Sequence, residues 1–250
     1  MSERAATTER TVSPSIPRPR ASRDPANILL DALAVAGFAG FAVLTVILWA
    51  HVLPFFDPPV RDAALQYRSW HDLWDLISNA ANYPLIVIGV GLVAWLFWKG
   101  KRREAVLVIV TLALVTAGSE GVKQLVHRPR PPGSDTVVPG VVYSYPSGHE
   151  LEAVTILGIV ALLVWRSRAT RAAATGVAIA VALFCVAVAV ARVAINAHWP
   201  SDVLAGLLGG IGVLALVTRL TRDDPHGRRD GDGGAGGSDP APIVPSSPDG

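Results

Sequence analysis

The chain is poor in cysteine and in charged residues, and both shortages restrict what it can be. Cys185 is the single cysteine among 250 residues, so no disulfide can form within the chain and no thiolate metal site is expected. Charged residues make up only 17% of the sequence, whereas 51% are hydrophobic and the mean hydropathy is +0.41. A net charge of +2 gives no indication of a nucleic-acid partner. This composition is too apolar for an ordinary soluble domain and is typical of a polytopic membrane protein.

Long apolar runs predict six transmembrane helices, because about 20 apolar residues span the hydrocarbon core of a bilayer. The runs lie at about 28–50, 83–98, 105–126, 149–166, 172–195 and 202–220. The proline-containing segment 51–82 is expected to be an extramembrane loop with one short interfacial helix over residues 70–80. The fold is therefore predicted to be all-α, with one membrane domain over residues 28–220 folded as a helical bundle.

The two ends of the chain are polar. Residues 1–27 contain five arginines among Ser, Thr and Pro, and residues 221–250 are rich in Gly, Asp and Pro. Neither end can bury an apolar core, so both are predicted to be disordered tails. The first apolar run is longer than the hydrophobic part of a signal peptide and lacks a clear cleavage site, which favours a transmembrane helix.

The distribution of basic residues predicts the orientation in the membrane. Most of the 22 Arg and Lys residues lie in the N-terminal tail, in 99–103, in 166–171 and from residue 219 onward. With six spans these four segments share one side, which the positive-inside rule makes cytoplasmic. Both termini are therefore expected in the cytoplasm of a cell that carries the protein in its plasma or inner membrane. Basic residues on the opposite, extracytoplasmic face call for a functional explanation.

Three polar clusters fall on that predicted extracytoplasmic face. The first begins at Lys123 and places further cations in a stiff Arg-Pro-Arg-Pro turn. In the second, Pro146-Ser147-Gly148-His149, small residues at a helix start let backbone N–H groups approach an anion. The third follows the fifth run and combines an Arg, whose planar fork suits phosphate, with a His and an Asp. Taken singly, the clusters also fit a snorkelling Lys, an interfacial His or a plain helix start.

Together, the clusters supply charge stabilisation, a nucleophile and an acid, which phosphoryl transfer through a phosphohistidine requires. Their order is K-x6-R-P (Lys123, Arg130, Pro131), P-S-G-H (Pro146 to His149) and R-x5-H-x3-D (Arg192, His198, Asp202). This pattern, over about residues 83–220, resembles the type 2 phosphatidic acid phosphatase (PAP2) superfamily, which also includes the vanadium haloperoxidases. The resemblance implies a PAP2-type helical bundle.

The resemblance also implies the role of each motif residue. His198 is implied as the nucleophile, Asp202 as the group that orients it, and His149 as the acid that protonates the leaving oxygen. The implied phosphate-binding residues are Lys123, Arg130, Ser147, Gly148 and Arg192, with Arg128 as an additional cation. No metal or other cofactor is implied.

Three residues near the motifs leave questions open. Ala191 stands where the family's third motif usually has Ser, so one supporting phosphate contact is expected to be missing. Glu150 stands where a small residue is common, and it either tunes substrate choice or merely favours the helix start. Glu120 lies three residues before Lys123 on one helix face, and it is either the partner of that Lys or a water-exposed Glu.

The predicted function is an integral membrane lipid phosphatase that hydrolyses a lipid phosphomonoester or diphosphate at the extracytoplasmic face. Phosphatidic acid, phosphatidylglycerol phosphate and undecaprenyl diphosphate are candidate substrates, because the motifs depend only on the phosphate. The expected partners are this substrate and membrane lipids, without nucleic acid, and the sequence predicts no oligomeric state. One alternative is a non-catalytic lipid-phosphate binding or transport protein, in which loss of His198 or His149 would be expected. The other is a haloperoxidase, a soluble class that six spans disfavour.

Overall fold

The computed structural model describes residues 24–134 and 143–222, and these residues are mainly helical. The helices are α1 (Pro25–Trp49), α2 (Asp57–Leu65), η1 (Arg68–Trp70), α3 (His71–Ala80), α4 (Tyr83–Trp98), α5 (Arg102–Val126), α6 (Gly148–Arg166), α7 (Arg171–Ala194) and α8 (Pro200–Arg222). In these two ranges the β-structure amounts to an isolated antiparallel bridge between Pro129 and Tyr143. The all-α prediction is confirmed. The predicted tails lie almost entirely outside the described residues.

Within the described residues, six helical stretches are long and apolar enough to cross a membrane. Five of them are α1, α5, α6, α7 and α8, and the sixth is the 31-residue stretch Arg68–Trp98. In that stretch α4 has only 16 residues. It is therefore about 24 Å long, which is less than the roughly 30 Å of a hydrocarbon core. The chain is a multi-pass membrane protein, as the sequence predicted.

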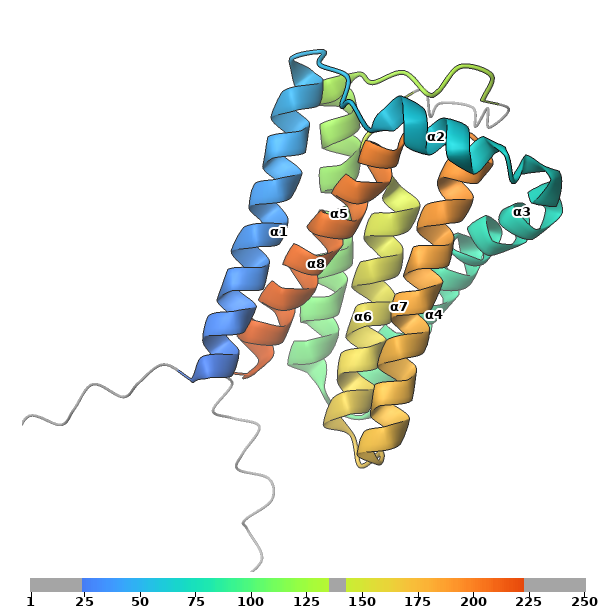
Figure 1. Cartoon of the computed structure of the whole chain (residues 1–250). Coiled ribbons are helices and arrows are strands. Elements are labelled where there is room, and N and C mark those ends of the chain that lie inside the picture. Colours follow the sequence, from blue (N-terminus) through green and yellow to red (C-terminus); the bar gives the residue numbers. More distant parts are fainter. Residues whose placement is uncertain (1–23, 135–142, 223–250) are drawn as a thin grey trace, which may run out of the picture.

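Helices α1 and α8 pack closely through glycine. A Cβ at Gly37 would lie 2.6 Å from the carbonyl oxygen of Leu208 and 2.8 Å from the nitrogen of Gly212, so no side chain fits there. Small residues of this kind let membrane helices approach each other closely. Figure 1 shows the two helices side by side, with the start of α1 and the end of α8 at the same end of the bundle.

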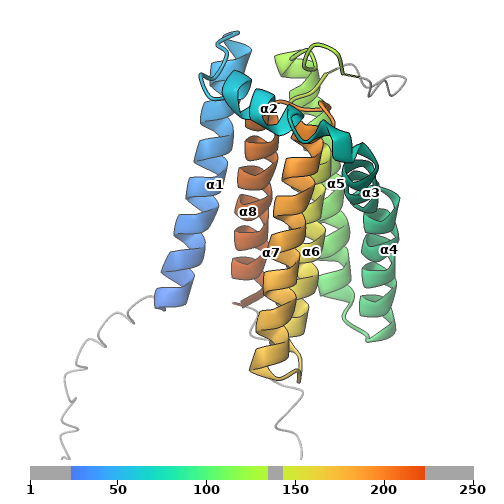
Figure 2. The same ribbon diagram turned by 45° about the vertical axis from the view of Figure 1, so that its right-hand side comes forward.

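The opposite end of the bundle carries the predicted extramembrane loop. The sequence predicted one short helix in this loop, but the structure has α2 in addition to α3, and α2 crosses the end of the bundle in both views (Figures 1 and 2). Pro58 and Pro59 look like helix breakers in the sequence. They stand in the first turn of α2, however, where the missing N–H is not needed and the fixed φ suits a helix.

The three motifs meet at this same end. Helices α5 and α7 end there, while α6 and α8 begin there (Figure 1). The motif residues stand at these helix ends or in the turns between them. The fold therefore brings together segments that are separated by up to about eighty residues in the sequence, as the helix parity predicted.

Candidate active site

The first motif turns sharply where α5 ends. His127 follows the last helical residue with a left-handed φ of 52°, and its N–H donates to the carbonyl of Lys123 at 3.0 Å. His adopts this conformation more readily than most residues. The chain then runs back over the bundle, where the N–H of Ser144 donates to the carbonyl of Arg128 at 2.9 Å. This turn places two arginines above the helix ends.

Lys123 joins the first motif to the second. Its Nζ pairs with Oε1 of Glu120 at 2.5 Å, so the interpretation of Glu120 as its partner is confirmed, although that Glu is itself largely exposed. A Cβ at Gly148 would lie 3.8 Å from Nζ of Lys123, an ordinary contact distance. His149 also lies within electrostatic reach of Lys123 and of His198. The last turn of α5 and the first turn of α6 thus face a common space.

His198 and Asp202 lie across the turn between α7 and α8. Nδ1 of His198 is 3.5 Å from Oδ2 of Asp202, an ion-pair distance that is longer than a good hydrogen bond. The His198 side chain is almost fully buried, and burial lowers its pKa to about 4, an effect that Asp202 partly offsets. The imidazole is therefore neutral near pH 7. One ring nitrogen faces the carboxylate, and the other is left for chemistry.

Buried donors from all three motifs lack a protein partner in the described part of the chain. They include Nε of Arg130, Nε of Arg192, Oγ of Ser147 and Nδ1 of His198, which is in ion-pair range of Asp202 but makes no hydrogen bond. The other side of each guanidinium is anchored, since Arg130 donates to the carbonyl of Ala197 and Arg192 to Oγ of Ser78, both at 2.7 Å. Burial lowers the pKa of Arg130, with a partial offset from Asp202. Anchored guanidinium groups with unused donors are suited to phosphate oxygens.

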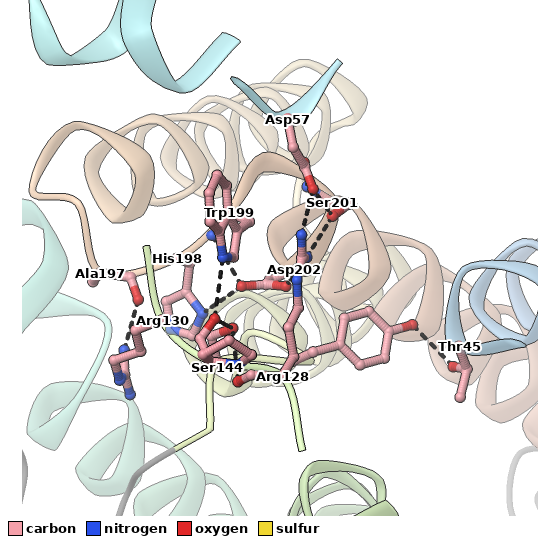
Figure 3. Close-up of polar contacts among 12 residues, drawn as sticks. Thr45, Asp57, Arg128, Arg130, Ser144, Ala197, His198, Trp199, Ser201 and Asp202 are labelled. Atoms are coloured by element: carbon pink, nitrogen blue, oxygen red, sulfur yellow. Dashed lines mark hydrogen bonds and ion pairs between the residues drawn. The ribbon is translucent and has the colours of Figure 1, made fainter. Parts of the chain in front are cut away.

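Arg128 has a different environment from the other cations. Its Nη1 donates to Oδ1 of Asp202 at 2.5 Å and to Oγ of Ser201 at 2.6 Å, while Nη2 donates to Oδ2 of Asp57 at 2.5 Å (Figure 3). The guanidinium also lies over the Trp199 ring, 5.2 Å from its centroid. Both terminal nitrogens are thus bound to protein acceptors. Arg128 thus links the first motif to Asp57 and Asp202, and its role as an additional phosphate-binding cation stays a prediction.

Two residues that hold the arginines of the site were missed from the sequence. Asp57 is fully buried and accepts from the N–H and Oγ of Ser201, at 2.8 and 2.6 Å, besides Arg128. Ser78 accepts a hydrogen bond from Arg192. It thus gives Arg192 a hydroxyl partner, although position 191 has Ala in place of the usual Ser. Asp57 precedes two prolines, a pattern that equally indicates a helix start, and Ser78 had no distinguishing signal. Their partners lie 71 or more residues away along the chain.

A second set of contacts ties α2 to the outer rim of the site. Nε of Arg61 donates to Oδ1 of Asn196 at 2.7 Å, and its Nη2 donates to the carbonyl of Pro132 at 2.9 Å. Nδ2 of Asn196 donates to the same carbonyl at 2.8 Å. The Arg61 guanidinium also lies 5.6 Å from the centroid of the Trp199 ring, which Arg128 contacts as well. Helix α2 therefore borders the site.

The start of α6 departs from the pattern that its sequence suggests. Ser147 and Glu150 have the spacing of a capping box, in which each side chain bonds the other's backbone. The N–H of Ser147 instead donates to the carbonyl of Asp202 at 3.0 Å. Glu150 is fully buried, and among the described residues neither of its carboxylate oxygens has a partner. The absence of the box leaves Oγ of Ser147 available to a ligand.

Comparison with known proteins bears on the family and the fold. Residues 104–225 match the family model described as PAP2 superfamily. The crystal structure of the first transmembrane PAP2 type phosphatidylglycerolphosphate phosphatase from Bacillus subtilis has the same fold, with a TM-score of 0.63 and 20% sequence identity over 75% of this chain and 96% of that one. No curated protein matches the sequence. The resemblance seen in the motifs is confirmed over residues 104–225, and the chain shares the fold of that transmembrane PAP2-type protein.

Proposed function

We propose that this protein is a metal-independent lipid phosphatase that acts through a phosphohistidine at the extracytoplasmic face. The observation that carries the proposal is the buried, neutral His198, held beside Asp202 in a site where Arg130 and Arg192 keep unused donors. The substrate is a lipid phosphomonoester or diphosphate. Phosphatidic acid, phosphatidylglycerol phosphate and undecaprenyl diphosphate remain the candidate headgroups.

The proposed first step transfers the phosphoryl group to His198. Because Nδ1 faces Asp202, Nε2 attacks the phosphorus, an N–P bond forms, and the bond from phosphorus to the leaving oxygen breaks. His149 gives its proton to that oxygen, so the lipid leaves as an alcohol or, from a diphosphate, as a monophosphate. The guanidinium groups of Arg130 and Arg192, with Lys123, stabilise the charge on the remaining phosphoryl oxygens.

The second step returns the enzyme to its starting state. Water attacks the phosphorus and gives a proton to His149, an O–P bond forms, and the N–P bond to His198 breaks. Asp202 stabilises the positive charge on the phosphorylated His198 ring. When phosphate leaves, His198 is again a neutral imidazole beside Asp202. This cycle uses the cations of the chain itself to balance the phosphate charge.

The proposed face of the membrane follows from the charge of the loops. The motifs lie at the end of the bundle opposite to the start of α1 and the end of α8 (Figure 1). The positive-inside rule assigns the end that holds the start of α1, the end of α8 and the basic residues around Lys101 to the cytoplasm. In intact cells, a cysteine introduced at Leu53 should react with a membrane-impermeant maleimide, and one at Lys101 should not. The reverse pattern would place the site at the inner leaflet.

The direct test of the activity is phosphate release from the three candidate lipids by the purified protein in detergent, with a chelator present. We expect release that is abolished in His198→Gln, which also controls for a contaminating phosphatase. Tight binding of a lipid phosphate without release by the wild type would favour the non-catalytic alternative. Release that requires an added divalent cation would contradict the metal-independent mechanism.

A further inference from the structure

A long apolar groove runs along the lipid-facing surface of the bundle, between α5 and the α1–α8 pair. Its volume is about 500 Å³. The residues of α5 that line it run from Leu107 to Val122, and the remaining lining comes from α1 and α8 and from Leu151 of α6. Leu114 in this lining is 68% exposed, so the groove is open to the surroundings of the bundle. In a membrane protein those surroundings are lipid.

Glycines on both sides keep this groove open. The tight packing of α1 against α8 at Gly37 holds these two helices together. On α5, Gly118 lines the groove, and a Cβ there would meet nothing within 4 Å. Across from it, Gly209 of α8 adds no side chain and allows Phe41 of α1 to lie over it. Two of the residues that line the groove on α5 and α8 thus add no side chain to it.

One end of the groove reaches the candidate active site. Ser119 lines the groove, and its buried Oγ has no partner among the described residues. A Cβ at Gly148 would lie 3.8 Å from Oγ of Ser119 and equally 3.8 Å from Nζ of Lys123. The end of the groove therefore lies directly beside the cation that joins the first two motifs. A molecule with a phosphate at Lys123 can continue past Ser119 into the groove.

The length of the groove suits a single long hydrocarbon chain. From Leu107 to Val122 the α5 helix rises about 22 Å. One leaflet of the hydrocarbon core is about half of 30 Å thick. The groove therefore extends beyond the bilayer midplane, and a chain attached at its site end can lie along it without bending back.

A second apolar groove provides a comparison. It lies among α6, α7 and α8, has a similar volume of about 480 Å³, and is lined by residues such as Val154, Cys185 and Leu207. No residue of the three motifs lines it. Both grooves are apolar and face lipid, so apolarity alone does not distinguish them. Only the α5 groove is next to a phosphate-binding residue.

We propose that the α1–α5–α8 groove binds the hydrocarbon chain of the lipid phosphate substrate, with the phosphate held beyond Ser119 at Lys123. The proposal rests on the proposed function and extends it, because it makes the groove a determinant of chain selectivity. A lipid phosphate is thereby held along α5 while its headgroup is placed against His198. A substrate without a chain gains nothing from the groove.

The first test fills the groove and leaves the motifs intact. In Gly118→Trp the new side chain occupies the groove. The matched control is Gly121→Trp: a Cβ at Gly121 would likewise have no atom within 4 Å, but Gly121 does not line the groove. Both changes replace glycine within one helix, so both should fold. We expect Gly118→Trp to lower kcat/KM for a long-chain lipid phosphate about tenfold or more, since small displacements of the reacting atoms cost at least that much.

The same variant should keep its activity toward an aryl phosphate that has no chain, and Gly121→Trp should keep both activities. Equal loss on both substrates in Gly118→Trp would overturn the groove proposal, since it would indicate damage to the site itself. Unchanged activity toward the lipid would overturn it as well.

A second test measures chain binding without requiring turnover. A lipid phosphate with a diazirine at mid-chain is compared with the lipid alcohol that carries the same chain, in phosphatidylcholine vesicles at low probe density. The phosphate probe should label groove residues around Leu114 and Gly118 more than the alcohol does, and inorganic phosphate or vanadate should compete. Equal labelling by both probes would mean that bulk lipid occupies the groove and would overturn the proposal.

The two tests separate the groove from the proposed function. Phosphate-dependent labelling of the groove without any phosphate release would support the groove and contradict the phosphatase. Phosphate release with equal labelling by both probes would support the phosphatase and contradict the groove.

Discussion

The Asp57–Arg128–Asp202 network makes a sharp prediction about Asp57→Asn. The carboxylate of Asp57 is fully buried and accepts hydrogen bonds from Arg128 and from both donors of Ser201. An amide of the same shape carries no charge and turns one acceptor into a donor, so at least one of these donors loses its acceptor. Removing one partner of a buried ion pair costs about 3–5 kcal/mol. Because Asp202 still faces Arg128, we expect the lower end of that range, about 3 kcal/mol.

The assay for this prediction is the free energy of unfolding in detergent, with Asp62→Asn as the matched control. Asp62 also lies on α2 and also pairs with an arginine, Arg61, at 3.2 Å, but its side chain is 67% exposed. Exposed ion pairs contribute at most about 1 kcal/mol, so this control should change little. Asp57→Asn should also lower activity, because Arg128 then pairs with one carboxylate, Asp202, instead of two and competes with His198 for it. Equal effects of the two substitutions on stability would refute the proposed role of the network.

Three further predictions follow from other parts of the site. Burial lowers the pKa of His198 from 6.5 to about 4, so as the pH falls the unfolded chain takes up this proton before the folded protein does. The stability of the protein should therefore decrease as the pH falls from 6.5 to 4, and His198→Gln should flatten that part of the plot of Tm against pH. Ser78→Ala leaves a buried N–H of Arg192 without its acceptor and should lower kcat/KM about tenfold, whereas Ser78→Thr should retain activity. Gly206→Ala should destabilise the protein by about 1–3 kcal/mol in thermal unfolding, since a Cβ there would lie 2.7 Å from the carbonyl oxygen of Ser147, the N-cap of α6. Gly176→Ala should have little effect, because a Cβ at Gly176 would have no atom within 4 Å.

The parts of this fold that the sequence predicted are those with a local signal. The spans are long apolar runs, and the predicted run at 83–98 coincides with α4 at both ends. The motif residues stand at the ends of these runs, so helix parity alone predicted that they share one face. The structure brings Lys123, Gly148 and His198 to that common end as expected.

The parts that escaped the sequence depend on contacts between distant segments. Nothing in Arg-Pro-Arg-Pro distinguishes Arg128, which pairs with two carboxylates, from Arg130, which keeps an unused donor. The difference is made by Asp57, which lies 71 residues before Arg128 and in a helix that starts with two prolines. A local pattern cannot show which cation a distant buried carboxylate selects.

The central claim, that His198 carries the phosphoryl group, is tested most directly by trapping the phosphoenzyme. His149→Asn lacks the group that activates water, and an aryl oxide leaves without much help from an acid, so an aryl phosphate labelled with ³²P should leave its label on the protein. We predict an acid-labile, base-stable adduct that mass spectrometry assigns to His198 and that is absent from the His149→Asn, His198→Gln double variant. Phosphate release by the wild type with no label on His198 in His149→Asn, although that variant binds the substrate, would contradict the account.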